Sequence, residues 1–182
     1  MNDNDLLQTM TTIIDIYNKS IGADMGFTDD LRFGKEAEED MLGLIRTKYP
    51  LAFMVEGKHK AYDIFVPEIS AGIEVKCDKQ AEQTRNMFIE IECNHEYSGI
   101  LATTSEWYVY RTTKKVFWTK TSAIKTYLIS EAQNLKMFRN TPRGETSSVR
   151  GYLIPYEDFE TISDKYVHLD LITLSSQRKE TS

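Results

Sequence analysis

Apolar positions near the start of the chain recur every three to four residues, which is the spacing of an amphipathic helix. This spacing predicts a helix over residues 4–20, and Gly22 supplies a stop signal. The next stretch, 23–33, contains a glycine and several aspartates and is expected to be a loop. The inward-facing residues of the helix would be Leu6, Leu7, Met10, Ile13, Ile14 and Tyr17.

A second helix is predicted from about Gly34 to Lys48, after the loop. The Tyr49-Pro50 pair ends it, because a proline disfavours the helical conformation of the residue before it. Its buried stripe would consist of Met41, Leu42, Leu44 and Ile45.

From residue 51 the pattern changes to short apolar runs separated by turn residues, which is typical of strands. The spacing predicts an antiparallel meander of three strands at 51–55, 62–66 and 72–77, followed by a polar loop at 78–85. Further helices are expected at 123–133, with Thr121 or Ser122 as the cap, and at 156–163, and a flexible loop at 140–148. Further strands are predicted at 87–93, 99–104, 106–111, 116–119, 149–155 and 166–171.

Helices and strands therefore alternate in a chain of 182 residues, of which 41% are apolar, and this predicts an α/β (α+β) domain with a real core. No apolar run approaches the ~20 residues of a membrane span. The N-terminus, MNDNDLLQTM, lacks the pattern of a secretory signal, so a cytoplasmic protein without a membrane partner is expected. Cys77, Cys93 and three scattered histidines form no zinc pattern.

The net charge of −6 argues against a protein that simply coats nucleic acid, because phosphate contacts favour basic surfaces. It argues less against a nuclease, since carboxylates that bind a divalent cation add negative charge that the cation offsets.

Residues 62–76 (YDIFVPEISAGIEVK) contain the charged positions that best predict chemistry. Asp63 lies near the start of one predicted strand, and Glu74 and Lys76 lie two apart on the next. Side chains at i and i+2 of a strand share a face, so Glu74 and Lys76 are expected to point the same way. A hairpin can bring Asp63 back to them, so that all three charges meet at one end of the sheet.

Two carboxylates placed in this way suit a hard divalent cation such as Mg²⁺ or Mn²⁺, with the backbone carbonyl of Val75 as a further ligand. Such a cation polarises a phosphate oxygen and lowers the pKa of a bound water, which becomes the nucleophile. Lys76 would position that water, deprotonate it as the neutral amine, or stabilise charge on the phosphorane as the ammonium. The segment therefore predicts phosphodiester hydrolysis.

An aspartate followed on the next strand by Glu-x-Lys resembles the PD-(D/E)XK nuclease superfamily, which includes restriction endonucleases and Holliday junction resolvases. The first element is Tyr62-Asp63 here, with tyrosine in place of proline, and the second is intact as Glu74-Val75-Lys76. The resemblance covers roughly residues 34–111, which is less than half of the chain.

This resemblance implies a metal-dependent DNA endonuclease that uses Mg²⁺, for which Mn²⁺ can substitute. Its fold would be a restriction endonuclease-like core, a central mixed sheet flanked by helices, in one domain over residues 1–182. The helix at 4–20 and a C-terminal extension over about 140–182 would be attached to that core. DNA would be the partner, and the sequence leaves open whether the enzyme is a homodimer. Similarity to phage-type members implies a virus or mobile element as the source.

Members of this superfamily often carry a glutamate on the preceding helix in a G-x-x-x-E pattern, which Gly34 and Glu38 match. Glu38 shares a helix face with the apolar stripe and is expected to lean toward the sheet and support the metal or the water. Glu36 and Asp40 are expected to point away. Glu39, next to that face, is the main alternative and Glu36 a second, while the whole cluster can also simply complement the helix dipole.

Other polar residues follow the Glu-x-Lys strand. Lys79 and Arg85 would hold substrate phosphates, or are ordinary surface charges. Glu90 would approach the metal, or lies on a solvated strand face. The aromatic residues of the later strand favour core or interface packing over base stacking, and these are Trp107, Tyr108 and Tyr110.

Two other interpretations of the motif remain open. In one, the chain is a catalytically inactive nuclease-like domain that serves as a protein-binding or assembly module. In the other, Asp63 and Glu74 are unrelated surface carboxylates. The sequence therefore predicts a nuclease with Asp63, Glu74, Lys76 and Glu38 as its site, against these two alternatives.

Overall fold

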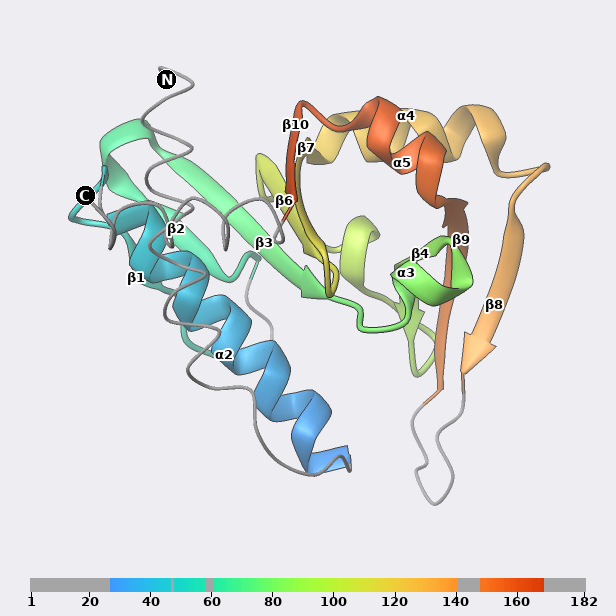
Figure 1. The fold of residues 1–182 in the computed structure, drawn as a ribbon, viewed down its shortest axis with the longest axis horizontal. Coiled ribbons are helices and arrows are strands. Elements are labelled where there is room, and N and C mark those ends of the chain that lie inside the picture. The colour runs from blue at the N-terminus through green and yellow to red at the C-terminus, as the bar shows by residue number, and fades with distance from the viewer. Residues whose placement is uncertain (1–26, 47, 58–60, 141–147, 169–182) are drawn as a thin grey trace, which may run out of the picture.

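A computed structural model of the chain describes residues 27–46, 48–57, 61–140 and 148–168 (Figure 1). The predicted helix at 4–20, most of the predicted loop at 140–148 and the tail after residue 168 lie outside the described residues. No helix in the described part is long and apolar enough to cross a membrane.

The centre of the fold is a six-stranded mixed sheet in the order β1-β2-β3-β6-β7-β10. Neighbouring strands pair antiparallel, except that β3 and β6 are parallel. Together with the flanking helices this confirms the predicted α/β class with a mixed central sheet, and the antiparallel meander of the first three strands is confirmed as well. The strands are β1 (Phe53–Met54), β2 (Ile64–Val66), β3 (Ala71–Cys77), β6 (Trp107–Arg111), β7 (Lys115–Lys120) and β10 (Lys165–His168).

A second, antiparallel sheet has the order β5-β4-β9-β8 and lies on the far side of β6 and β7 from helix α2 (Phe27–Arg46) (Figure 1). Its central strand β4 alternates buried and half-buried residues, as the sequence pattern predicted. The strands are β4 (Asn86–Cys93), β5 (Glu96–Tyr97), β8 (Lys136–Asn140) and β9 (Val149–Pro155).

The described part of the chain also contains three longer helices and three short helical turns. Helix α2 (Phe27–Arg46) lies along one face of the central sheet, whereas α4 (Thr121–Glu131) and α5 (Tyr156–Ile162) lie side by side near the second sheet (Figure 1). The short elements are η1 (Pro67–Ile69), α3 (Ala81–Thr84) and η2 (Gly99–Leu101).

The central sheet separates two apolar cores. The first lies between α2 and the sheet and includes Met41, Leu42, Leu44 and Ile45 from the helix and Ile64, Ile73, Val75, Val109 and Val116 from the strands. The second joins the opposite face to the second sheet, α4 and α5, and includes Tyr108, Tyr110, Phe117, Met87, Ile89, Ile124, Ile154, Tyr156 and Phe159. Adjacent strand residues thus serve different cores, as the pleat of a strand requires.

Three predicted elements were wrong, and one strand was missed. Helix α2 already includes residues 27–33, and the interior Gly34, which costs about 1 kcal/mol against alanine, is tolerated because the buried stripe holds the helix. The predicted loop at 78–85 contains α3, because Asp78 Oδ1 accepts from the N–H groups of Gln80 and Ala81 and starts the helix.

The predicted strand at 99–104 is η2 followed by irregular chain. Gly99 has a φ of 52°, a left-handed conformation that breaks a regular strand, and only Ile100 of the apolar run is fully buried. Strand β8 was missed because it is an edge strand in which Met137 and Phe138 are both exposed, so burial does not alternate.

Candidate active site

Asp63 is the residue before β2 and is held against β3 through both its backbone and its side chain. Its N–H donates to the carbonyl of Ile73 (2.9 Å), and its Oδ2 accepts from the N–H of Val75 (2.7 Å). The register pairs Ile64 with Ile73, so Asp63 lies opposite Glu74. The Asp63 carboxylate thus accepts the hydrogen bond that a backbone carbonyl would accept in a regular sheet. The bond fixes it next to Val75, the residue between Glu74 and Lys76.

Glu74 and Lys76 project from one face of β3, and their charged groups meet. Lys76 Nζ lies 2.7 Å from Glu74 Oε1. Ile73 and Val75 point to the other face and pack in the core beneath α2. Asp63 and Glu74 are only 3% and 7% exposed, whereas the Lys76 side chain is 37% exposed. The structure therefore brings these three predicted site residues together at the edge between buried and accessible regions.

The electrostatics of Glu74 indicate a place where negative charge is in excess. Burial raises the pKa of the Glu74 carboxyl above its ordinary value, and the charge of Asp63 raises it further. The ammonium of Lys76 and a hydrogen bond from Thr103 act in the opposite direction without reversing the shift. A buried glutamate whose ionised form is disfavoured by burial and by a neighbouring carboxylate marks a place where a bound cation would be favourable.

Lys76 is held in its charged form. Burial disfavours the ammonium, but the negative charges of Glu74 and Asp63, and of Tyr108 when that phenol ionises, outweigh burial and raise the Lys76 pKa. At neutral pH the lysine is therefore a donor and a positive charge. Of the roles that the sequence left open, this favours orienting water or stabilising phosphate charge over deprotonating the water.

Thr103 is a member of the site that the sequence pattern did not reveal. Its Oγ1 lies 2.8 Å from the carbonyl of Ala61 and 3.3 Å from Glu74 Oε2, and these two acceptors compete for its one proton. The N–H of Thr104 also donates to Ala61, and Lys125 Nζ donates to the Thr103 carbonyl. The crossing from the second sheet to β6 is thereby held against the end of the Asp63 strand.

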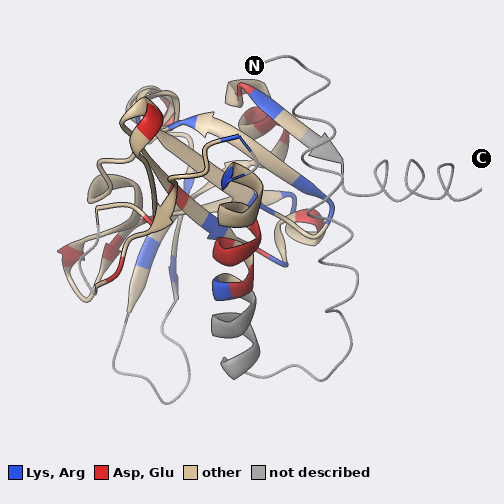
Figure 2. Ribbon diagram, turned by 90° about the vertical axis from the view of Figure 1, so that its left-hand side faces the viewer, with Lys and Arg blue, Asp and Glu red and all other residues tan. Residues whose placement is uncertain are grey.

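The acidic run of α2 is shown in red along that helix in Figure 2. Glu38 is half-buried, and its charge acts on the thiol of Cys77, whose pKa burial raises to about 12. Cys77 continues the alternation of β3 and so belongs to the α2 face, opposite to Glu74. The structure thus places Glu38 beside the end of β3, and its support of the metal or water stays a prediction.

Asp40, which was expected to point away from the sheet, contacts it. Its Oδ2 lies 3.1 Å from Nη1 of Arg111 on β6, a side chain that is 3% exposed. Burial raises the pKa of Asp40 and Arg111 opposes this. Glu39, the main alternative to Glu38, is an exposed residue that lies 3.9 Å from Lys35 one turn earlier. Asp40 therefore forms an ionic contact between the helix and the sheet.

Tyr108 belongs to the second core and lies beside the site, whereas Glu90 lies on β4 between the core residues Ile89 and Ile91. Glu90 Oε1 accepts from Ser98 Oγ at 2.5 Å, and Tyr108 lies next to Glu74 in the parallel register of β3 and β6. Besides burial, which raises the Tyr108 pKa, the charges that act on this phenol are, in decreasing order, those of Lys76, Glu74, Glu90 and Asp63.

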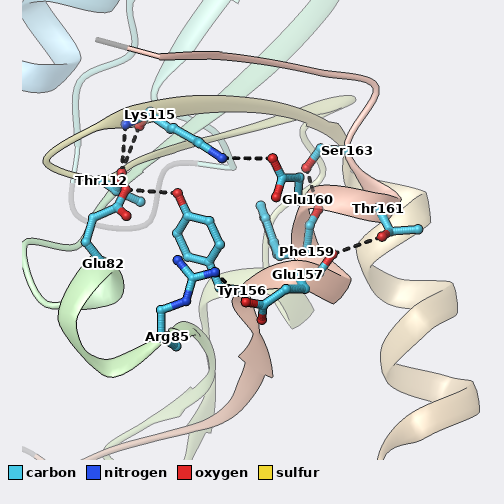
Figure 3. A network of polar contacts seen from close by, with 10 residues as sticks. All are labelled: Glu82, Arg85, Thr112, Lys115, Tyr156, Glu157, Phe159, Glu160, Thr161 and Ser163. Atoms are coloured by element: carbon cyan, nitrogen blue, oxygen red, sulfur yellow. Dashed lines mark hydrogen bonds and ion pairs between the residues drawn. The ribbon is translucent and has the colours of Figure 1, made fainter. Parts of the chain in front are cut away.

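The two predicted phosphate ligands lie after β3. Lys79 is half-buried in the turn before α3. Arg85 forms an ion pair with Glu157, and its guanidinium lies 4.1 Å from the ring centre of Tyr156 (Figure 3). These contacts join the end of α3 to α5, so phosphate binding by Arg85 would have to compete with them.

Figure 3 also shows that this second polar cluster is satisfied internally. Glu82 Oε1 accepts from the hydroxyls of Thr112 (2.6 Å) and Tyr156 (2.9 Å), and Lys115 Nζ lies 2.8 Å from Glu160. The cluster links α3, the β6–β7 turn and α5. Its polar groups bond to one another, so its role is to hold these elements together.

The two carboxylates of Asp63 and Glu74 suit Mg²⁺ better than a metal whose whole coordination shell is made of protein ligands. Within the described ranges, no group of three or more His, Cys, Asp or Glu side chains is placed to hold a metal. Mg²⁺ commonly uses one or two carboxylates and completes its shell with water and phosphate oxygens. The Val75 carbonyl stays a predicted ligand, while the N–H of the same residue holds Asp63.

Two open hollows lie on the described surface near α4, of about 690 and 490 Å³. Neither is lined by Asp63 or Glu74, which agrees with their burial, since an ion bound at 2.0–2.6 Å needs little space. The smaller hollow borders the site through Thr104 and Lys125.

No protein-family model, curated protein or solved structure matches this chain. Its function is therefore inferred from the site.

Proposed function

We propose that this protein is a Mg²⁺-dependent endodeoxyribonuclease of the PD-(D/E)XK type, in which Mn²⁺ can substitute. The observation that carries this proposal is the Asp63 carboxylate held on the Val75 N–H, beside a buried Glu74 that contacts Lys76. Asp63 and Glu-x-Lys lie on paired neighbouring strands of a mixed sheet, which agrees with the resemblance drawn from the sequence.

Asp63 and Glu74 would hold the cation between their carboxylates. A bound Mg²⁺ would polarise a phosphate oxygen and lower the pKa of water. The cation would offset the burial and the repulsion from Asp63 that raise the Glu74 pKa, and Glu74 would give up part of its contact with Lys76. The lysine ammonium, which is partly exposed, would then be available to donate to a phosphate oxygen or to the attacking water.

The substrate backbone would approach the exposed side of Lys76. DNA is the proposed partner, and a homodimer would supply a second site for the second strand. Lys79 and Arg85 remain the proposed phosphate ligands. Because the net charge is −6, binding would depend on the cation and local lysines rather than on the whole surface.

The alternative is an inactive nuclease-like module that binds another protein. One observation favours it: Glu74 is already paired with Lys76 and Asp63 with the Val75 N–H, so the cluster is partly satisfied without a cation. The raised pKa of Glu74 counts against it, because a purely structural cluster gains nothing from two buried carboxylates that repel. The burial of both residues counts against the third interpretation, that they are unrelated surface carboxylates.

Cleavage of supercoiled plasmid and of a branched DNA in Mg²⁺ tests the proposal, with EDTA as the metal-free condition. Lys76→Ala should lower the rate by about 100-fold or more, because it removes the donor to the reacting phosphate. The matched control is Lys114→Ala, which removes an exposed lysine of the β6–β7 turn and should leave the rate unchanged. A wild-type protein that cuts neither DNA and binds no Mn²⁺ would exclude the nuclease and favour the module.

A further inference from the structure

The smaller of the two hollows, about 490 Å³ in volume, lies at the open end of the β6–β7 hairpin, beside the start of α4. Every side chain that lines it carries a charge or a hydroxyl group. A ligand of this hollow would therefore be held by hydrogen bonds and charge rather than by apolar contacts. The lining residues are Thr104, Ser105, Glu106, Lys120, Thr121, Ser122 and Lys125.

Lys125 brings a positive charge to this hollow without an acidic partner. The residue is half-buried, and its Nζ donates to the Thr103 carbonyl at 3.1 Å, but it forms no ion pair within the described residues. Three other lysines with partly buried side chains each lie 2.6–2.8 Å from a glutamate, and these are Lys76, Lys115 and Lys120. Charges removed from water are normally paired, and an ammonium has three protons to donate. Lys125 therefore retains protons and a charge for a further acceptor.

A buried pair of hydroxyls supplies another donor to the same hollow. Ser105 Oγ and Thr121 Oγ1 lie 3.0 Å apart, and the two residues are only 5% and 4% exposed. Each hydroxyl has one proton, and the bond between them uses one of the two. The second proton has no acceptor in the described part of the chain, and a buried donor without an acceptor costs free energy. A ligand oxygen in the hollow would accept it.

The charges around the hollow favour an anion. The Glu106 carboxylate lies 2.6 Å from Lys120, so these two charges offset each other. The charge of Lys125 is then in excess, although the whole protein has a net charge of −6. A phosphate group supplies several strong acceptor oxygens together with the compensating negative charge. The hollow thus has the donors and the charge to bind a phosphate group.

One residue connects this hollow to the proposed metal site. The carbonyl of Thr103 accepts from Lys125, and the hydroxyl of Thr103 lies 3.3 Å from Glu74 Oε2. Phosphates of one DNA strand follow one another every ~3.4 Å along the axis of a duplex. A strand whose cleaved phosphate lies at the cation would therefore place one of its next phosphates close to Lys125.

We propose that the smaller hollow binds a phosphate of the DNA strand close to the one that is cut, with Lys125 and the Ser105–Thr121 hydroxyl pair as donors. Lys125 is thus a substrate-binding residue that fixes the strand relative to Glu74. The inference rests on the proposed function, because it assigns a second phosphate of the same substrate. It adds a site to those of Lys79 and Arg85.

Steady-state cleavage by wild type and by Lys125→Ala at several NaCl concentrations tests this inference. Each phosphate contact to duplex DNA contributes about −0.9 to the slope of log affinity against log salt, which amounts to about eightfold between 1 M and 0.1 M salt. Lys125→Ala should therefore make the slope of log(kcat/KM) less steep by about 1 and raise KM about eightfold at 0.1 M NaCl. Its kcat should stay within about twofold, because this contact is the same in the ground state and in the transition state.

Three further measurements separate a phosphate contact from other roles of the lysine. Lys125→Arg keeps the charge and should restore KM and the salt slope to near the wild-type values. Lys114→Ala removes an exposed lysine at the opposite end of the β6–β7 hairpin and should change neither. The Mn²⁺ affinity of Lys125→Ala should equal that of wild type, because Lys125 contacts neither proposed carboxylate ligand.

An unchanged KM and salt slope in Lys125→Ala would overturn the inference and leave the nuclease proposal standing. A loss of Mn²⁺ affinity and kcat with an unchanged slope would also overturn it, because Lys125 would then only support Thr103. A wild-type protein that neither cuts DNA nor binds Mn²⁺ would overturn both.

Discussion

The carboxylate of Asp63 accepts a hydrogen bond of 2.7 Å from the backbone N–H of Val75, the residue between Glu74 and Lys76. This bond fixes the first acidic residue of the site relative to the second, because Val75 belongs to the same strand as Glu74. It also gives Asp63 two separable roles, as an acceptor for the backbone and as a negative charge.

Substitutions of Asp63 separate these roles. Asp63→Asn keeps an oxygen that can accept from Val75, so the free energy of unfolding should stay within about 1 kcal/mol of wild type. Asp63→Ala leaves the Val75 N–H buried without its acceptor and should lose about 1–3 kcal/mol. Urea denaturation measures both values, and equal stability of the two variants would contradict the role of the bond. Neither variant should bind Mn²⁺.

The raised pKa of Glu74 predicts how stability depends on pH without metal. The folded protein holds the Glu74 proton more tightly than the unfolded chain, whose glutamate titrates near the ordinary value of 4.5. This contribution to stability is therefore complete below pH 4.5 and is lost as the pH rises through the folded-state pKa. Glu74→Gln should remove this part of the pH dependence in urea denaturation between pH 4 and 7.

The affinity for metal should depend on pH in the opposite direction to the stability of the metal-free protein. A cation needs the ionised carboxylate, so Mn²⁺ affinity should fall as the pH drops through the raised pKa of Glu74, above the range of an ordinary glutamate. Isothermal titration calorimetry at a series of pH values measures this. Affinity that stays constant down to pH 4.5 would show that Glu74 is not a ligand.

The buried ion pair of Arg111 and Asp40 should be a main determinant of stability away from the site. Arg111→Met leaves Asp40 without its partner and should reduce the free energy of unfolding by about 3–5 kcal/mol. Arg111→Met combined with Asp40→Leu should cost less than the single change, because no unpaired charge remains. A single variant as stable as wild type would contradict the burial of this pair.

The Cys77 thiol should react slowly in the folded protein. Burial raises its pKa to about 12, so almost none is thiolate at pH 8, and the thiolate is the reactive form. In a Cys93→Ser background, labelling with iodoacetamide at pH 8 should be much slower in the folded protein than in urea, because unfolding restores the ordinary thiol pKa. Rapid labelling without urea would indicate that the α2 face of β3 is open.

Local pattern was sufficient to predict the meander from Phe53 to Cys77 and the shared face of Glu74 and Lys76. Turn residues bound these strands, and a spacing of two residues in a strand fixes the face. The hairpin that places Asp63 opposite Glu74 also follows from short-range spacing.

Long-range features could not be predicted in this way. Thr103 and Tyr108 reach the site because β6 pairs parallel to β3 after a crossing through the second sheet, and no periodicity encodes that pairing. The contact of Asp40 with Arg111 likewise depends on how α2 lies on the sheet. Asp78 was a local signal for the start of α3. It was overlooked because the polar composition of residues 78–85 suggested a loop.

The most direct test of the central claim is the anomalous scattering of Mn²⁺ in a crystal of the wild-type protein soaked with MnCl₂. The proposed site predicts a peak within ~2.0–2.6 Å of a carboxylate oxygen of Asp63 and of one of Glu74. A protein that cuts DNA with Mn²⁺ while its crystals show no peak between these two residues would contradict the assignment of the site.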